Sequence, residues 1–252
     1  MRQNQRLICA NVLRLIAYMT TPGGLTGAPR RLLTLAHALR EEGVSVCVAS
    51  QPGSRLLEEA RAGGHSTADI NAAGILALRQ GALFGGGLGF RLRVLFDLLR
   101  QNWRLFRCVR SRHGDAVWIR GSKGIAFGAL GAVMSRRPLI WDVDYELPSR
   151  GIVRWLHRLG LWASESVVFQ YSAAPEAIFG QRLAARYSRK FQTIIPGIDL
   201  GSLEVFRAMR AQREKSRGKP FVILQVGTVC DRKNQRLIVD ALAHLKEQGL
   251  AQ

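Results

Sequence analysis

Short apolar runs alternate along this chain with longer runs in which apolar residues recur every three or four positions. The short runs are rich in Val and Ile, and several are continuously apolar, which is typical of parallel strands covered on both faces. They predict strands at residues 12–19, 44–50, 116–119, 138–142, 167–170, 193–195 and 221–226. The longer runs have the helical period and predict helices at residues 29–42, 55–62, 90–112, 125–135, 152–163, 175–185 and 234–248.

The alternation of strand and helix predicts an α/β protein with a doubly wound, parallel, Rossmann-like sheet. Residues 208–220 interrupt the pattern because they are polar and basic and end in Gly-Lys-Pro before a new apolar run. We expect residues 1–205 to form one complete domain, residues 206–220 a linker, and residues 221–252 the first strand–helix unit of a second domain. Since one such unit cannot bury a core, we expect the sequence to be cut at the start of that domain.

Charge adds a preference for anionic partners. The chain has 37 Lys and Arg against 18 Asp and Glu, a formal net charge of +19. Much of this excess lies between Arg79 and Arg137, where the only acids are Asp97 and Asp115. Such a patch attracts anionic lipid, nucleic acid or phosphorylated substrates. The basic segment has few aromatic residues and no nucleic-acid recognition motif, which argues against nucleic acid.

The predicted helix at residues 90–112 is basic and amphipathic. One face carries arginines at helical spacing, and we expect an apolar stripe on the opposite face. The arginines are Arg93, Arg100, Arg104 and Arg107, and the stripe is Leu92, Leu95, Leu99, Trp103 and Phe106. Two interpretations stay open: a helix that lies on a membrane surface, or an ordinary surface helix that covers a protein core. No segment has the roughly 20 apolar residues that a membrane span needs.

Several kinds of chemistry find no support in the sequence. The four cysteines form no CxxC pair, which favours a reducing compartment over a disulfide scaffold or a zinc ribbon. The chain has no HExxH, GxSxG or P-loop motif, and its five histidines are scattered. We therefore predict no metal site and no cofactor.

Glycine turns before helices are the strongest candidates for a binding site. The first strand leads into residues 22–31 (PGGLTGAPRR), where free amide groups at a helix start, next to Arg30, favour a phosphate ester. Gly227 follows the strand at 221–226, and Lys233 lies at the next helix start, which suits a diphosphate. Either turn could instead be a tight turn without a ligand.

Three acids follow the strand at 138–142, in the segment Trp141-Asp-Val-Asp144-Tyr-Glu146. The carboxyl ends of parallel strands are where α/β folds keep their ligands, so these acids could bind sugar hydroxyls or orient an acceptor. They could equally be an ordinary strand end with acids at a helix start.

Taken together and in order, these segments resemble the family 4 glycosyltransferases, which have the GT-B fold. Residues 27–30 (GAPR) and the helix that ends before residues 44–48 resemble the family's opening "GGAER … RGHEV" pattern. Residues 115–119 resemble its "PDVVH" strand, and residues 164–172 its "ADxVI … S" segment. Residues 194–199 (IIPGID) are similar to "VIPNGVD", and residues 224–235 (LQVGTVCDRKNQ) to "VGRLxxxKN".

The resemblance implies an acceptor-side amino-terminal domain, a donor-binding carboxyl-terminal domain, and sugar transfer with retention and without metal. It assigns Gly27, Gly227, Thr228 and Lys233 to the donor diphosphate. It assigns Arg30, Asp144, Tyr145 and Glu146 to the acceptor side, and Gly197 to the interdomain cleft. The sequence departs from the family at Thr228, where Arg is usual, and at Pro29, where Glu is common.

The leading prediction is a glycosyltransferase that transfers a sugar from a UDP-, GDP- or ADP-sugar to a lipid-linked or cell-surface glycan acceptor. The family's paired glutamates, which hold the donor, would lie beyond residue 252, so we expect inactivity unless a second chain completes the donor domain. We expect a cytoplasmic protein, peripheral on the inner face of the membrane. The alternative is a non-catalytic binding module whose basic patch docks on anionic membrane or a partner glycosyltransferase.

Overall fold

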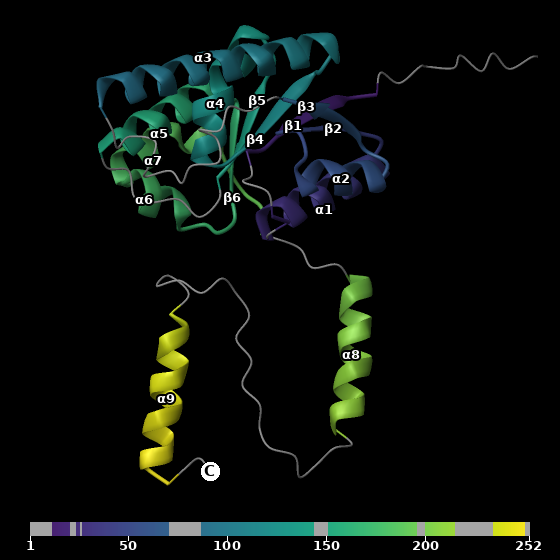
Figure 1. Cartoon of the computed structure of the whole chain (residues 1–252), viewed down its shortest axis with the longest axis vertical. Coiled ribbons are helices and arrows are strands. Elements are labelled where there is room, and N and C mark those ends of the chain that lie inside the picture. Colours follow the sequence, from purple (N-terminus) through teal and green to yellow (C-terminus); the bar gives the residue numbers. More distant parts are fainter. Residues whose placement is uncertain are drawn as a thin grey trace, which may run out of the picture. The chain divides into compact units, whose positions relative to one another are not determined.

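A computed structural model describes residues 12–20, 24–25, 27–70, 87–143, 151–195, 200–214 and 234–249 of the chain (Figure 1). The chain divides into two compact units, Met1–Pro196 and Gly197–Gln252. The first unit contains the sheet and is described first.

The sheet of the first unit has seven strands in the order β3-β2-β1-β4-β5-β6-β7, and every neighbouring pair is parallel. The strands are β1 (Arg14–Tyr18), β2 (Ser45–Ser50), β3 (Ser66–Asp69), β4 (Ala116–Arg120), β5 (Leu139–Asp142), β6 (Ser166–Phe169) and β7 (Phe191–Thr193). The predicted doubly wound α/β fold is therefore confirmed.

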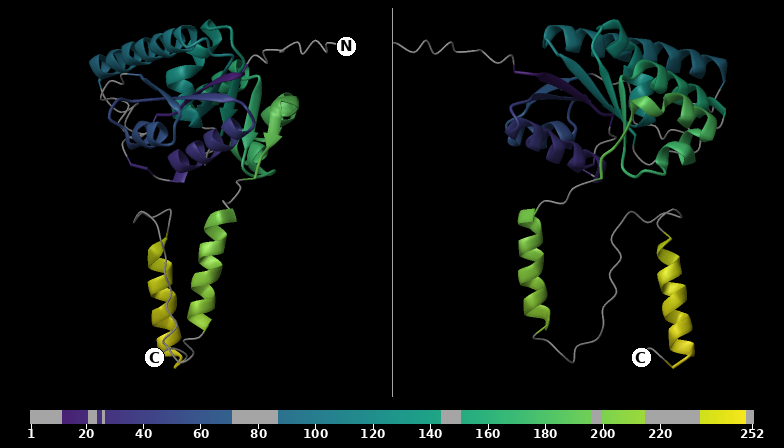
Figure 2. Two further views of the ribbon diagram at one scale, coloured as in Figure 1. Left: turned by 90° about the vertical axis from the view of Figure 1, so that its right-hand side faces the viewer. Right: turned by 180° about the vertical axis from the view of Figure 1, so that it is seen from behind.

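Helices cover both faces of this sheet (Figures 1 and 2). One layer consists of α1 (Gly27–Glu41) and α2 (Arg55–Ala62). The other layer consists of α3 (Leu88–Ser111), α4 (Gly121–Met134), α5 (Gly151–Ala163), α6 (Ala174–Phe179) and α7 (Gln181–Tyr187). A 3-10 turn, Ser188–Lys190, leads into β7.

Each helical layer encloses its own core because successive strand residues point to opposite faces. In β1, Ile16 and Tyr18 are buried beneath α3 and α4, in a cluster with Leu105, Ile119 and Phe127. Their neighbours Leu15 and Ala17 belong to the cluster beneath α1 and α2, with Leu32, Val48 and Leu57. This double burial explains why the strands are continuously apolar.

Small residues let α4 pack closely against α3. A Cβ atom on Gly131 would overlap the carbonyl oxygen of Asn102 in α3. Asn102 in turn clamps the two helices, since its Nδ2 donates to Ala126 O at 3.1 Å and its Oδ1 accepts from Gly131 N at 3.0 Å. The contact therefore depends on glycine at position 131.

The helix predicted at residues 90–112 is α3, but its faces differ from the expectation. Most of the arginine stripe and of the apolar stripe is exposed, with Arg104 and Phe106 half-buried, whereas a third face with Val94, Leu105 and Val109 is buried. The prediction of only two faces, with arginines opposite the apolar residues, is therefore wrong. The apolar stripe does not cover the core.

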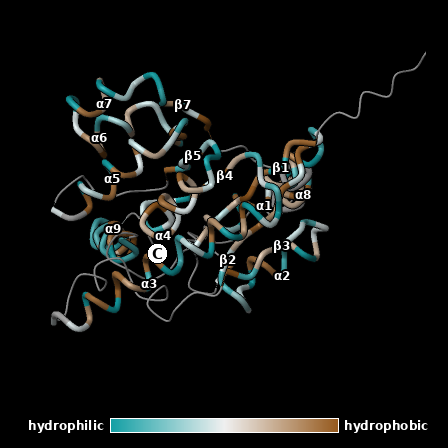
Figure 3. Tube along the Cα trace, turned by 90° about the horizontal axis from the view of Figure 1, so that it is seen from above, coloured by the Kyte–Doolittle hydropathy of each residue, from teal (hydrophilic) through white to brown (hydrophobic). Residues whose placement is uncertain are grey.

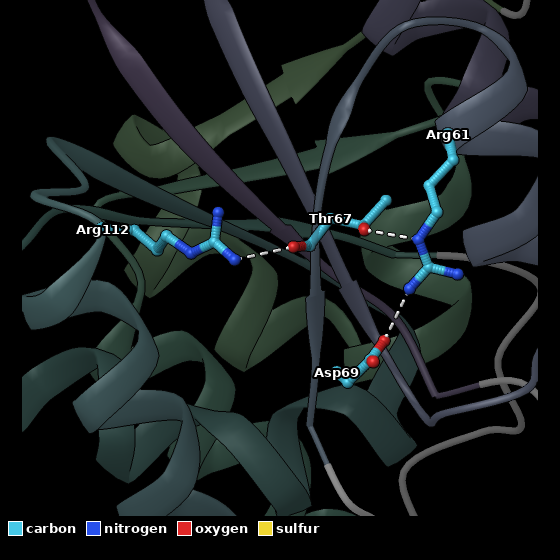
Figure 4. Close-up of polar contacts among 4 residues, drawn as sticks. All are labelled: Arg61, Thr67, Asp69 and Arg112. Atoms are coloured by element: carbon cyan, nitrogen blue, oxygen red, sulfur yellow. Dashed lines mark hydrogen bonds and ion pairs between the residues drawn. The ribbon is translucent and has the colours of Figure 1, made fainter.

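The sequence pattern missed the edge strand β3, whose residues Ser-Thr-Ala-Asp have no apolar run. Two arginines hold this strand in place (Figure 4). Arg61 donates through Nε to Thr67 Oγ1 at 3.0 Å and pairs with Asp69 at 2.9 Å. Arg112 donates to the carbonyl oxygen of Thr67 at 2.8 Å. Side-chain bonds, rather than apolar patterning, thus specify β3.

Two further helices differ from expectation. The helix predicted at 175–185 is divided into α6 and α7 by Gly180, whose φ of +79° cannot continue a helix. In the second unit, α8 (Leu200–Glu214) includes residues 206–214, the first part of the expected linker. The helix expected at 234–248 is α9 (Gln235–Glu247), whereas the strand expected at 221–226 lies outside the described residues.

Candidate functional site

The strand order marks one place where a ligand would bind the first unit. The chain proceeds outward from β1 toward β2 and β3, then returns to the other side of β1 with β4. In parallel α/β sheets, the loops that leave the carboxyl ends of two such strands separate and form a crevice. Here one is the loop that joins β1 to α1, and in place of the other is the direct junction between Arg120, the end of β4, and Gly121, the start of α4.

The first side of this crevice is the start of α1. Gly27 is the first helical residue and is exposed, and a Cβ atom built on it would have no heavy atom within 4 Å. Arg30, one turn later, is also exposed. The amino terminus of a 15-residue helix carries partial positive charge and free amide groups, which favour an anion. The turn therefore leaves room for a phosphate to approach the backbone.

A buried ion pair lies at the carboxyl ends of β4 and β5. Arg120 and Asp142 are partners in the parallel register, so their side chains point to the same face of the sheet. Arg120 Nη1 lies 2.6 Å from Asp142 Oδ2, and the two side chains are 3% and 2% exposed. Arg31 of α1 reaches the same carboxylate, with 4.0 Å between its Nη2 and Asp142 Oδ1.

This cluster of Arg31, Asp142 and Arg120 joins α1 to the edge of the sheet. Arg31 retains 15% side-chain exposure, whereas the side chains of Arg120 and Asp142 are almost fully buried. The cluster therefore fixes the first turn of α1, with Gly27 and Arg30, at the carboxyl edge of the sheet.

The second side of the crevice is the start of α4. Gly121 follows β4 with a φ of +71°, and Ser122 accepts or donates a 3.1 Å hydrogen bond with His157 Nε2 of α5. Burial lowers the pKa of His157 to about 4, so its imidazole is neutral at pH 7. Burial also lowers the pKa of Lys123. His157 is packed between the rings of Trp141 and Phe179 and acts as a structural residue.

Two buried polar atoms near the carboxyl end of β2 are a further feature of this end of the sheet. Within the described part of the chain, Gln51 Oε1 and Ser54 Oγ, which follow β2, are buried without a hydrogen-bond partner. Buried polar groups usually have partners, so these two atoms are exceptions at this end of the sheet.

The structure describes two of the residues that the sequence nominates as a site. Gly27 and Arg30 lie together in the first turn of α1. The others lie outside the described residues: Asp144, Tyr145, Glu146, Gly197, Gly227, Thr228 and Lys233. Arg120 and Ser122 were missed, although a strand that ends in Arg-Gly-Ser-Lys before a helix is a signal of the same kind as the first turn.

The described residues include neither a metal-binding cluster nor a helix that could cross a membrane. They contain no group of three or more His, Cys, Asp or Glu side chains that could hold a metal ion. Among the described helices, none combines the length and the apolar character that a membrane crossing requires.

Comparison with solved structures places this fold among glycosyltransferases. The chain is similar to Anabaena Alr3699/HepE in complex with UDP and glucose, with a TM-score of 0.62 and 16% identity. The match covers 92% of this chain and 58% of HepE, so the chain spans less than two thirds of that protein's length. HepE has the same TM-score in its complex with UDP-glucose.

A glycosyltransferase from Rickettsia africae ESF-5 is similarly related. Its TM-score is 0.60 at 14% identity, and the match covers 96% of this chain and 68% of that one. No protein-family model and no curated protein sequence matches the chain. The likeness therefore establishes a Rossmann-like α/β fold of the GT-B glycosyltransferase type.

Proposed function

We propose that the chain belongs to a glycosyltransferase that uses a nucleotide sugar as donor. The observation that carries the proposal is the fold, which matches HepE bound to UDP-glucose over 92% of the chain. The start of α1, with open space at Gly27 and the exposed Arg30, lies where such a fold keeps its ligands and supports the same assignment.

The finer assignments rest on the sequence resemblance. We infer a family 4 enzyme that transfers with retention, with Gly227, Thr228 and Lys233 on the donor diphosphate. Lys233 would stabilise the negative charge of the leaving group, a large electrostatic contribution in such reactions. The division of the chain into a first domain at residues 1–205, a linker at 206–220 and the start of a second domain at 221–252 is part of the same inference.

We also infer the acceptor class from that resemblance. Asp144, Tyr145 and Glu146 would face a lipid-linked or cell-surface glycan, together with Arg30. Such an acceptor is presented at a membrane, so the working location would be the inner face, with the protein peripheral. A donor domain completed by a second chain is part of the same proposal.

Nucleotide-sugar binding can be tested at Gly27 without disturbing the fold. A Val side chain there would extend into open space, where the proposal places a phosphate. Gly89, in the first turn of α3, is a matched control because its Cβ would also have no neighbour within 4 Å. Titration calorimetry of the full chain with UDP-, GDP- and ADP-glucose measures the affinity of each variant.

Once a second chain completes the donor domain, we expect one of these nucleotide sugars to bind, and Gly27→Val to weaken its binding at least tenfold with an unchanged unfolding midpoint. Gly89→Val should bind like the unsubstituted chain. Absence of binding by all three, or equal binding by both variants, would contradict the proposal.

The second candidate function is a non-catalytic module that docks on anionic membrane or a partner glycosyltransferase. The outer side of α3 favours it because large apolar side chains and arginines are exposed there together. A transfer assay with radiolabelled nucleotide sugar and lipid-linked acceptors distinguishes the two when a second chain completes the donor domain: the glycosyltransferase then transfers sugar, whereas the module transfers none from any donor.

A further inference from the structure

The outer side of α3, which faces away from the sheet, exposes many large apolar side chains. Five large apolar residues of α3 are exposed by 51% to 63%: Leu92, Leu95, Phe96, Leu99 and Trp103. The buried side of the same helix includes the polar residues Asp97, Gln101 and Asn102. Gln101 donates to Tyr18 Oη at 3.2 Å, and Asn102 bonds to α4. Helices that only cover a core normally show the reverse arrangement.

The neighbouring helices extend this apolar area. Helix α4 packs against both α3 and α5, and it exposes Leu130 by 37% and Met134 by 50%. Helix α5 exposes Trp155 by 68% and Trp162 by 60%, and these residues lie two helical turns apart on the same face. Figure 3 shows the apolar positions recurring along α3, between hydrophilic ones. We call these nine exposed residues of α3, α4 and α5 the α3–α5 surface.

Positive charge surrounds the apolar residues. The three helices carry eight arginines and one lysine, and their single acid, Asp97, is only 8% exposed. Arg93, Arg100 and Arg107 are exposed beside the apolar stripe of α3. On α5, the guanidinium of Arg158 lies 5.6 Å from the ring centre of Trp155. Arginine beside exposed tryptophan places a cation at the edge of an apolar surface.

This charge pattern selects one kind of partner. A second copy of the chain, joined through the same surface, would place arginines against arginines without an acid to offset them. An anionic bilayer offers phosphate groups at its surface and hydrocarbon a few ångströms below. A helix that lies in the interface plane exposes this combination of an apolar stripe and flanking cations.

We propose that the α3–α5 surface docks the protein on anionic membrane. The apolar residues of α3 and the two tryptophans of α5 enter the interface, and the flanking arginines contact lipid phosphates. This inference rests on the peripheral location proposed above and names the surface that would provide it. It shares no residue with the nucleotide-sugar site, so sugar binding and membrane docking can fail separately. It orients α3, about 36 Å long at 1.5 Å per residue, parallel to the bilayer plane.

Vesicle binding tests the charge requirement. The full chain is mixed with liposomes of phosphatidylcholine, with or without 30% phosphatidylglycerol, and bound protein is measured by flotation over a range of salt concentrations. We expect binding to anionic liposomes alone, weakening as salt rises. Arg93→Gln with Arg100→Gln should weaken binding about 30-fold, since each cation near such a surface contributes about 1 kcal/mol.

A double substitution on the other face of the sheet controls for the change in net charge. Arg40→Gln with Arg55→Gln removes the same two charges from exposed positions of α1 and α2. We expect this pair to bind within about threefold of the unsubstituted chain. Equal losses for both pairs would overturn the proposal, because net charge alone would then explain the binding.

The apolar requirement is tested by Phe96→Ser with Trp103→Ser. Both side chains are more than half exposed, so the variant should fold, and circular dichroism verifies this. We expect at least a tenfold loss of binding to anionic liposomes. Unchanged binding by the folded variant would overturn the proposal. So would a lipid-free dimer that this variant abolishes, since the surface would then join two copies of the chain.

Discussion

The two helical layers cover the same sheet, yet their outer sides differ. Helices α1 and α2 carry five arginines and three glutamates, and none of their large apolar residues is among the exposed ones. Helices α3 to α5 carry nine cations and one acid, which is buried, and they expose nine large apolar residues. Both layers bury an apolar core, so folding alone does not demand the difference. An exposed apolar area of this kind is typical of an interaction surface, so the contrast favours the α3–α5 side for the docking proposed above.

The layers are also held to the sheet by different means. At the carboxyl edge, Arg31 connects α1 to the Arg120–Asp142 pair. In the other layer, Gly124 and Gly128 let α4 approach Ile119 of β4 closely, and Asn102 of α3 bonds to α4. Substitutions at these points test the comparison, and the expected effects decrease in the order given below.

The largest effect is expected from Asp142→Asn, which leaves the buried guanidinium of Arg120 without its carboxylate. Loss of one partner of a buried pair costs about 3–5 kcal/mol of unfolding free energy. The same substitution at Asp69, whose pair with Arg61 is about half exposed, should cost less than about 1 kcal/mol. Urea denaturation of both variants measures the difference, and equal costs would show that burial of the pair is unimportant.

Gly131→Ala should destabilise the α3–α5 layer by about 3 kcal/mol, because the added Cβ would overlap the backbone of α3. Gly27→Ala, at the open start of α1, serves as the control and should leave the unfolding free energy within about 0.5 kcal/mol. A Gly131→Ala variant as stable as the control would show that the contact between α3 and α4 does not depend on glycine at position 131.

His157 makes the stability of the α3–α5 side depend on pH. Its folded pKa of about 4 lies below the usual 6.5, so the unfolded chain binds a proton that the folded chain excludes. The stability present above pH 6.5 therefore falls as the pH decreases toward 4, with a loss of about 2 kcal/mol at pH 5. Asn in place of His157 should flatten this pH dependence between pH 7 and 5. An identical dependence in the variant would exclude His157 as its cause.

The smallest effect is expected from Phe96→Ser on the outer side of α3. Because Phe96 is 63% exposed, the unfolding free energy should change by no more than about 0.5 kcal/mol. Leu105→Ser, on the buried side of the same helix, should cost about 3 kcal/mol or more. A large cost at Phe96 would mean that its side chain packs within the fold.

Apolar patterning predicted the fold because parallel strands that are buried on both faces are continuously apolar in the sequence. It placed β1, β2, β4, β5, β6 and β7 within about two residues. It could not find β3, whose single buried apolar residue, Ala68, makes no apolar run, and which is held by pairing with β2 and by side-chain bonds from Arg61 and Arg112. Periodicity showed that α3 is amphipathic but not which side is buried, because polar residues such as Gln101 face inward by hydrogen bonding.

The candidate site was only partly visible in the sequence. A glycine turn before a helix identified Gly27 and Arg30, because that signal is local. The contact of Arg31 and Arg120 with Asp142 depends on which strands are neighbours and in what register. Residues that are 111 and 22 positions apart from Asp142 show no pattern that a local reading detects.

Tryptophan fluorescence tests the difference between the two layers most directly. The chain has five tryptophans; Trp103, Trp155 and Trp162 are exposed on α3 and α5, whereas Trp118 and Trp141 are buried in the sheet. The measurement is quenching by anionic liposomes whose acyl chains carry bromine. We predict strong quenching of the unsubstituted chain and almost none in the triple Trp→Phe variant at the three exposed positions. Absence of quenching in the unsubstituted chain, or equal quenching in both, would contradict membrane docking by the α3–α5 surface.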